Sequence, residues 1–184
     1  MPFPRMLSRR RSWFGALLAL AGLVFAPAPS RAEPEDRVKA TYLYNFTTLV
    51  KWPESAFAGP QAPLVVGVVG RDPFEGGLES YLRGQKAGTR ALEVRHLRVG
   101  DAAALQGCHL LYVSAAERAA EVVRAVRGYP VLVVSDAEDF ARKGGTIGFV
   151  VRQQKIKLEI NRGVAQQARL GIPSDLLGIA TIVN

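Results

Sequence analysis

Short runs of consecutive apolar residues alternate along the chain with segments whose apolar positions recur at helical spacing. Apolar runs occupy residues 64–69, 108–113 and 131–134, while residues 91–98 alternate between apolar and polar. Continuous runs of this length are typical of parallel strands buried on both faces. Helical spacing covers residues 37–50, 74–82, 102–106 and 115–127. Together these elements predict an α/β fold, a three-layer sandwich in which helices cover a mostly parallel central sheet.

The end of the chain follows a different pattern. Residues 146–151 and 155–160 are two strand-like segments separated by three polar residues, which predicts an antiparallel hairpin near the C-terminus. Asn161 is expected to cap the helix that follows, and Pro173 marks its end. A last short helix is predicted over residues 174–180.

Residues 1–32 have the parts of a secretory signal peptide. Four arginines precede an apolar stretch at 16–26, and small residues suited to cleavage end the segment. The stretch is too short for a retained membrane anchor, so we expect cleavage and a single exported domain at residues 33–184. The arginine pair at 10–11 leaves both the general and the twin-arginine export routes open.

Removing this leader changes the charge of the chain. The full sequence carries 24 basic and 16 acidic residues, a net +8, but five of the basic residues lie within 1–32. The remaining 19 basic residues give the exported part a net +3, without the basic stripe that nucleic-acid binding requires. No later segment approaches the ~18 consecutive apolar residues of a membrane span. We therefore expect no nucleic-acid partner and no spanning segment after cleavage.

Two aspartates stand where predicted strands end. Asp72 and Asp136 could meet at one edge of a parallel sheet and hold Mg²⁺ for phosphoryl chemistry. The competing interpretation is structural, because Asp72 with Glu75 has the spacing of a helix capping box, and so has Ser114 with Glu117. We favour capping and expect no metal and no other cofactor.

The residues most often used in catalysis are few. Cys108 is the one cysteine, which excludes an internal disulfide and a cysteine zinc cluster, and its apolar run predicts a small buried side chain. His96 and His109 are the only histidines, and no serine or cysteine beside them has the context of a nucleophile. Adjacent residues on a strand face opposite ways, so Cys108 and His109 are not expected to share a metal. These observations favour a protein that is not an enzyme.

A pair of glycines, Gly144 and Gly145, precedes the predicted hairpin. Paired glycines indicate a tight bend or a close approach of backbone to another group. One interpretation is a docking surface formed with Phe140 and Phe149, and the other is an ordinary turn. The sequence leaves both open.

Motifs along residues 39–180 resemble the YfiR/HmsC-type periplasmic family. In chain order they are KATYLYNF at 39–46 with KWP at 51–53, VGRDPF at 69–74, GCHLLYV at 107–113, VVSD at 133–136, GGTIGF at 144–149, LEIN at 158–161 and LLGIA at 176–180. Each motif is short, but together they follow the order of the family through nearly all of the exported chain.

This resemblance implies a small periplasmic α/β protein without catalytic activity. Family members repress an inner-membrane diguanylate cyclase of the YfiN type by binding its periplasmic sensor domain, which lowers cyclic di-GMP and biofilm formation. Some members form homodimers, and some use disulfides as a redox control that the lone Cys108 does not permit within one chain. A nucleotide and an aromatic amino acid are also linked to the family, which keeps a small-ligand binding protein as an alternative.

A docking surface for the cyclase is expected near the hairpin, because apolar anchors surrounded by polar residues carry most interface energy. The candidate residues are Phe140, Ile147 and Phe149, with Glu159 nearby. The alternative is that these side chains belong to the core. The magnesium-dependent enzyme that would use Asp72 and Asp136 is the least favoured function.

Overall fold

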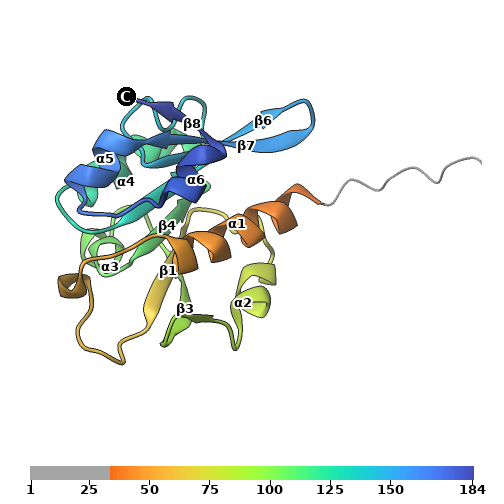
Figure 1. Ribbon diagram of the computed structural model, residues 1–184. Coiled ribbons are helices and arrows are strands. Elements are labelled where there is room, and N and C mark those ends of the chain that lie inside the picture. The colour runs from red at the N-terminus through yellow and green to blue at the C-terminus, as the bar shows by residue number, and fades with distance from the viewer. Residues whose placement is uncertain (1–33) are drawn as a thin grey trace, which may run out of the picture. The chain divides into compact units, whose positions relative to one another are not determined.

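Eight β-strands form one sheet, and helices pack against both of its faces (Figure 1). The computed structural model describes residues 34–184, and the predicted signal peptide at 1–32 lies outside the described residues. The strands are β1 (Leu64–Val69), β2 (Lys86–Ala87), β3 (Arg90–Leu97), β4 (Leu110–Val113), β5 (Leu132–Ser135), β6 (Ile147–Arg152), β7 (Lys155–Asn161) and β8 (Ala180–Val183). The helices are α1 (Glu35–Leu49), α2 (Gly77–Leu82), α3 (Ala102–Gln106), α4 (Ala119–Ala125), α5 (Arg162–Gln167) and α6 (Ser174–Gly178), with 3₁₀ turns η1 (Glu54–Ala56) and η2 (Ala116–Arg118).

The centre of the sheet is parallel, as the sequence predicts. The strand order is β2-β3-β1-β4-β5-β6-β7-β8, and the strands from β3 to β6 run in the same direction. β6 and β7 form the predicted antiparallel hairpin, with register from Ile147 opposite Ile160 to Arg152 opposite Lys155. The α/β class, the mostly parallel sheet and the C-terminal hairpin are therefore confirmed.

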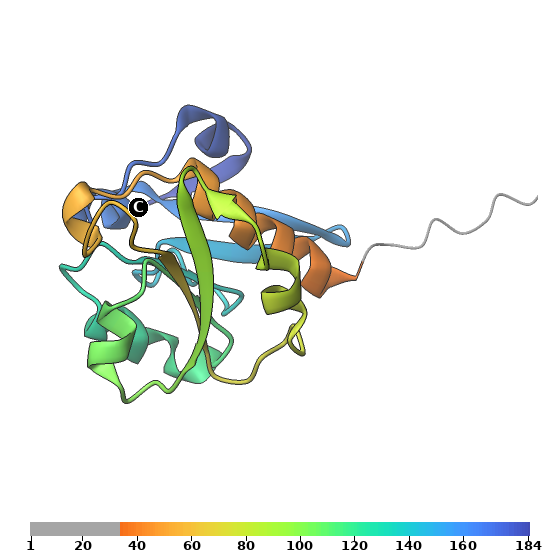
Figure 2. The same cartoon turned by 90° about the horizontal axis from the view of Figure 1, so that it is seen from below.

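Alternate side chains of the central strands enter two separate cores. Val66 and Val68 of β1 pack with α1, α2, α5 and α6, whereas Val65 and Val69 pack with α3 and α4. Figure 2 shows α1 and α2 on one side of β3 and α3 on the other. Because burying one Val or Leu side chain contributes about 1.5–3 kcal/mol, this two-sided burial is the main force that fixes the sheet.

The first helix packs through a stripe of residues spaced by four and three positions. Lys39, Leu43 and Phe46 are buried and lie on the face of α1 that covers the sheet. The helix ends before Trp52 and Pro53, since the residue before a proline is pushed out of the helical region. None of the helices within residues 34–184 has the combination of length and hydropathy that crossing a membrane needs.

Both predicted capping boxes are wrong. α2 begins at Gly77, and its N-cap is Gly76 with φ +79°, so Asp72 lies before the helix and its carboxylate accepts from the backbone N–H of Phe74 and of Gly76. The Ser114 hydroxyl contacts the carbonyl oxygens of Val69 and Arg71 instead of capping α4. Asp72 thus satisfies the backbone of its own loop, whereas Ser114, after β4, ties that loop to the end of β1 and the loop that follows it.

Two strands were not predicted. β2 has only two residues and pairs antiparallel with β3. β8, at the opposite edge, occupies residues that the sequence assigned in part to the last helix, and it pairs parallel with β7. A segment of four residues is too short to show a strand period, so the pairing partner decides its conformation.

The paired glycines permit a close approach. Gly144 has φ +96°, a conformation that favours glycine, and a Cβ at Gly145 would lie 2.2 Å from a ring carbon of Phe140. Phe140 is buried at 4% exposure, so its ring has little room to move. The backbone at Gly145 is therefore packed directly against an aromatic ring.

We predict that Gly145→Ala lowers the free energy of unfolding by about 1–3 kcal/mol, because the added methyl overpacks the Phe140 ring. Urea unfolding followed by circular dichroism measures the change. Gly100→Ala is the matched control, since a Cβ there meets nothing within 4 Å. Equal stability of the two variants would contradict the close packing.

Candidate functional site

A hollow of about 480 Å³ lies where α1, the loop after β5 and the β6–β7 hairpin come together. Charged side chains from all three elements line it, together with Phe149 and Val151 of the hairpin. The charged residues are Glu35, Lys39, Asp136, Glu138, Asp139, Arg152 and Glu159. We call this feature the charged hollow.

Lys39 is the cation at the base of the charged hollow. It is 5% exposed, and its Nζ lies 2.7 Å from Asp136 Oδ2 and 2.8 Å from Glu35 Oε1. Burial alone would lower the pKa of Lys39, but the hydrogen bonds and charges of Asp136 and Glu35 outweigh it and raise the pKa above its usual value. Lys39 is therefore a fixed positive charge at neutral pH.

Tyr112 completes this cluster from β4. Its hydroxyl donates to Asp136 Oδ2 at 3.0 Å, so that carboxylate oxygen accepts from two donors. Burial, and then the negative charge of Asp136, raise the pKa of Tyr112. The phenol therefore stays protonated and acts as a hydrogen-bond donor.

A second buried charge, Glu159, lies on β7. Its side chain is 6% exposed, and its oxygens lie 3.6 Å from Arg142 Nε and 3.5 Å from Arg152 Nη2. The two arginine side chains are themselves more than half exposed, at 52% and 66%. The carboxylate is thus held inside while its cationic partners extend into solvent, where another molecule can reach them.

Negative charge dominates the charged hollow. Five carboxylates line it against only Lys39 and Arg152, which gives a net −3. The chain as a whole carries a net positive charge, so this region differs in sign from the rest. Such a concentration of carboxylates favours the approach of a cationic group.

The apolar candidates of the sequence analysis lie in the core. Phe140, Ile147 and Phe149 are 4%, 0% and 3% exposed, so the prediction that they present an exposed apolar surface is wrong. Phe149 packs against the rings of Tyr42 and Phe46, since it lies on the face of β6 that α1 covers. Glu159 is equally buried, but its carboxylate faces the charged hollow.

The two aspartates proposed for Mg²⁺ have different partners. Asp136 binds Lys39 and Tyr112, as described above. A ligand atom of Asp72 instead lies within 4.8 Å of ligand atoms of Glu79 and His96. The structure thus brings Asp72 together with a histidine and a glutamate that the sequence analysis did not connect with it.

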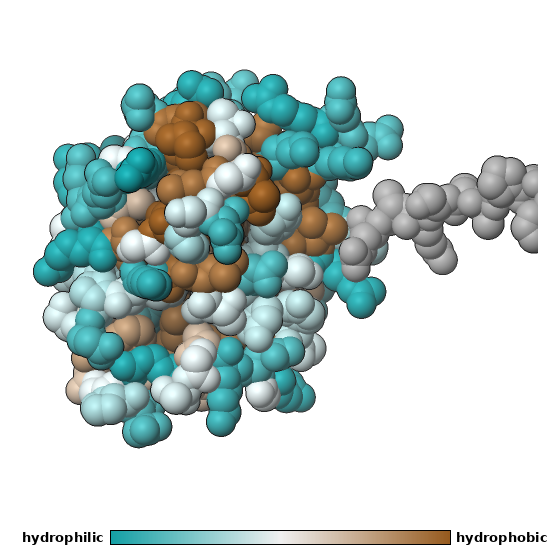
Figure 3. Space-filling view, in the orientation of Figure 1, coloured by the Kyte–Doolittle hydropathy of each residue, from teal (hydrophilic) through white to brown (hydrophobic). Residues whose placement is uncertain are grey.

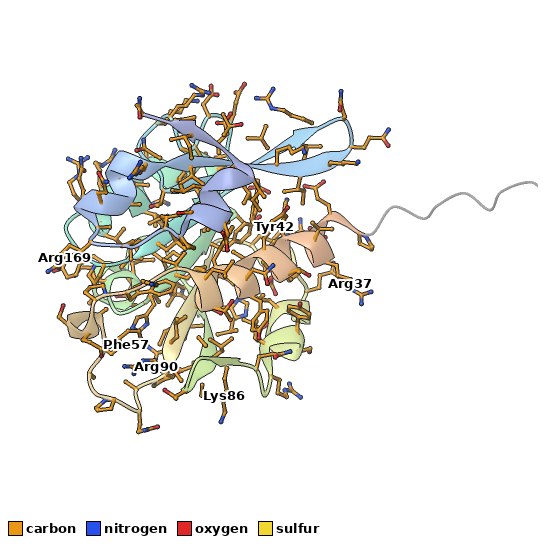
Figure 4. The ribbon with its side chains drawn as sticks, in the orientation of Figure 1. Arg37, Tyr42, Phe57, Lys86, Arg90 and Arg169 are labelled. Atoms are coloured by element: carbon orange, nitrogen blue, oxygen red, sulfur yellow. The ribbon has the colours of Figure 1, made fainter. Side chains whose placement is uncertain are left out.

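His109 has a structural role. Its Nδ1 accepts from the backbone N–H of Val65 at 3.0 Å, so its Nε2 carries the proton and donates to the carbonyl of Ala56 at 3.1 Å. Burial lowers the pKa of His109, which keeps the ring neutral. The ring also stacks on Phe57, and the Arg90 guanidinium lies 3.7 Å from the centre of the Phe57 ring. Figure 4 shows Phe57 and Arg90 side by side.

Cys108 is buried at 3% exposure, as predicted, and packs in the core with α3 and α4. Burial raises the pKa of the Cys108 thiol to about 11. Because the thiolate is the reactive form, the thiol is protected from oxidation in this position. Cys108 and His109 lie just before β4, which begins at Leu110 and not at Cys108, and they contact different groups.

Sequence reasoning missed Lys39, although a signal for it exists. Lys39 precedes Leu43 by four positions and so lies on the apolar stripe of α1. A lysine on a buried stripe requires an anionic partner, which indicates a site. Arg142 and Arg152 carry no such signal, because exposed arginines are common.

Comparison with known proteins finds one family model that matches the sequence. The YfiR/HmsC-like family model matches residues 36–181. No curated protein matches the chain.

Two solved structures share the fold. One is a conserved domain protein from Vibrio cholerae O1 biovar El Tor, at 15% identity and a TM-score of 0.53, with 79% of this chain and 60% of that chain covered. The other is an ABC domain in complex with L-Trp from Streptococcus pneumoniae, at 15% identity and a TM-score of 0.50, with 65% of this chain and 55% of that chain covered. The chain thus spans less than two thirds of either protein, and at this identity the likeness shows the fold alone.

The match to the family model shows more than these two structures do, because it is a match of sequence over most of the chain. The family is periplasmic and regulatory, and membership supports a general role as a regulator of cyclic di-GMP signalling. The chain belongs to the YfiR/HmsC-like family.

Proposed function

We propose that the protein is exported to the periplasm after cleavage of residues 1–32 and represses an inner-membrane diguanylate cyclase of the YfiN type by binding its periplasmic sensor domain. The result is less cyclic di-GMP and less biofilm. The family match supports the signalling role. The charged hollow is the observation that carries the binding step, because it concentrates a net −3 at one place on the surface.

The partner segment that fits the charged hollow is basic. Lysine or arginine side chains of the sensor domain would meet Glu138 and Asp139, two exposed acids on the loop after β5. Glu159, which sequence analysis named as a partner contact, lies behind Arg142 and Arg152, so it would act on a basic segment only through the negative charge that it adds to the hollow. Electrostatic complementarity of this kind speeds association and selects the partner.

Apolar contacts complete such an interface. Val151 lines the charged hollow and is 56% exposed, while Ile179, just before β8, and Ile182, on β8, are 63% and 44% exposed. Figure 3 shows apolar patches, in brown, on the face that carries α1 and α6. A basic segment in the hollow with apolar groups around it has the composition of a protein interface.

Repression then follows from differential affinity. A domain that binds the inactive arrangement of the sensor more tightly shifts the cyclase toward that arrangement. Changing a two-state ratio from 1:99 to 99:1 needs about 5.5 kcal/mol of such preference. A few desolvated charge pairs at the hollow are sufficient in principle, since close pairs at interfaces can each contribute more than 1.5 kcal/mol.

A small-ligand binding protein is the second candidate function. The volume of the charged hollow, about 480 Å³, lies within the range of roughly 300–1,000 Å³ that ligand pockets occupy. The pneumococcal domain holds L-Trp. A thermal shift of the purified protein with amino acids or nucleotides tests this function, and a shift that Glu138→Lys removes would support it.

For cyclase repression we predict that Glu138→Lys weakens binding to the sensor domain at least tenfold, because it reverses a charge on the rim of the charged hollow. Biolayer interferometry with the sensor domain measures the affinity, and binding of the wild type should weaken as salt increases. Glu54→Lys, at a side chain that is 95% exposed and outside the hollow, is the matched control.

In cells, deletion of the gene should raise cyclic di-GMP. The wild type and Glu54→Lys should restore the low level, whereas Glu138→Lys should not. A level that stays flat on deletion contradicts repression, and full restoration by Glu138→Lys contradicts the charged hollow as the docking surface.

We predict that Lys39→Met lowers the free energy of unfolding by about 1–3 kcal/mol at pH 7, because Asp136 and Glu35 lose their shared cation. Since the pKa of Lys39 is raised, the ion pair contributes fully below pH 10.5 and is lost as the pH rises through the raised value. The difference between wild type and variant in urea unfolding should therefore shrink at alkaline pH. Lys51→Met, at an exposed lysine, is the control, and a constant difference up to pH 11 would contradict the assignment.

A further inference from the structure

Three side chains that could bind a metal ion converge at the carboxyl ends of β1 and β3, away from the charged hollow. Asp72 follows β1, Glu79 belongs to α2 and His96 lies on β3, and their ligand atoms are within 4.8 Å of one another. In Figure 1, α2 lies beside β3, so the cluster joins a helix to the sheet. Ligands of open α/β sheets characteristically bind at the carboxyl ends of the strands.

The backbone holds the Asp72 carboxylate in place. Oδ1 accepts from the N–H of Phe74 and Oδ2 from the N–H of Gly76, both at 2.8 Å. A carboxylate has further lone pairs, so both oxygens can still bind a cation. Hydrogen bonds that orient a ligand in this way are the usual support of a metal site.

The Glu79 carboxylate provides the independent observation. Its Oε1 contacts His96 Nε2. The side chain is 31% exposed, but its Oε2 atom is buried and has no hydrogen-bond partner, the one such side-chain oxygen or nitrogen within residues 34–184. A buried carboxylate oxygen without a partner is costly, and a bound cation would remove that cost.

We propose that Asp72, Glu79 and His96 form a binding site for a divalent transition metal such as Zn²⁺. Zn²⁺ binds both imidazole nitrogen and carboxylate oxygen, and with three protein ligands a water would complete the tetrahedron. The imidazole favours zinc over Mg²⁺, which prefers oxygen ligands alone. The site does not depend on the charged hollow or on the cyclase.

Zinc at this site fastens α2 to β3 and to the loop after β1. Because the unfolded chain does not hold the three ligands together, metal binding stabilises the folded state. Metal binding should therefore raise the free energy of unfolding of the domain, in addition to fixing the position of α2.

Equilibrium titration tests the site. The untagged protein, freed of metal by a chelator, is titrated with Zn²⁺ in competition with a chromophoric chelator, and the melting temperature Tm is measured in parallel. The wild type should bind one Zn²⁺ with a rise in Tm. His96→Gln should weaken binding by roughly tenfold or more. Glu93→Gln, at a carboxylate on β3 that pairs with Arg95, is the matched control and should bind as the wild type does.

Glu79→Gln separates metal binding from folding. Its amide is isosteric and uncharged, so we expect a folded variant whose Tm without metal is not lower than that of the wild type, while the rise in Tm with Zn²⁺ is lost. Three results would overturn the proposal: no Zn²⁺ binding by the wild type, binding that persists unchanged in His96→Gln, or displacement of Zn²⁺ by an equal concentration of Mg²⁺.

Discussion

The burial of both faces of the parallel sheet is the constraint on which the rest of the structure depends. All six residues of β1 are buried, and alternate side chains require cover on opposite sides. Helices must therefore occupy both faces, which leaves the ends of the strands as the places where charged groups reach solvent. The charged hollow and the cluster of Asp72, Glu79 and His96 both lie at such ends, on different parts of the sheet.

Lys39 shows how a charge can lie on a buried stripe. Its side chain is buried on the inner face of α1 while its ammonium reaches Asp136 and Glu35. An unpaired ammonium at that depth would be strongly destabilising, so the loop after β5 must supply an acid. Because the hollow gathers more carboxylates than Lys39 and Arg152 neutralise, the same arrangement that stabilises α1 leaves an excess of negative charge for a partner.

The sequence predicts what depends on local pattern. The central strands, α1 and the hairpin follow from runs and spacing, and the Asn161 cap follows from residue type, since its Oδ1 accepts from the N–H of Val164. The local sequence pattern does not predict a conformation or a burial that depends on contacts with residues far away in the chain. β8 exists because β7 offers an edge, and Phe149 is buried because α1 covers it. The closeness of Asp72 and His96 depends on the register of β1 against β3, which no motif encodes.

The direction of the pKa shifts bears on what kind of function these groups serve. An acid or base in catalysis needs a pKa near the working pH, so active sites move the pKa values of their groups toward neutrality. In this protein the pKa values of Cys108, Tyr112 and Lys39 are raised and that of His109 is lowered, so each moves away from pH 7. Each of these groups keeps one protonation state near neutral pH and forms hydrogen bonds with neighbouring groups of the protein. All four side chains are buried, so their fixed protonation states stabilise the structure around them, and only Lys39 adds a charge to the charged hollow.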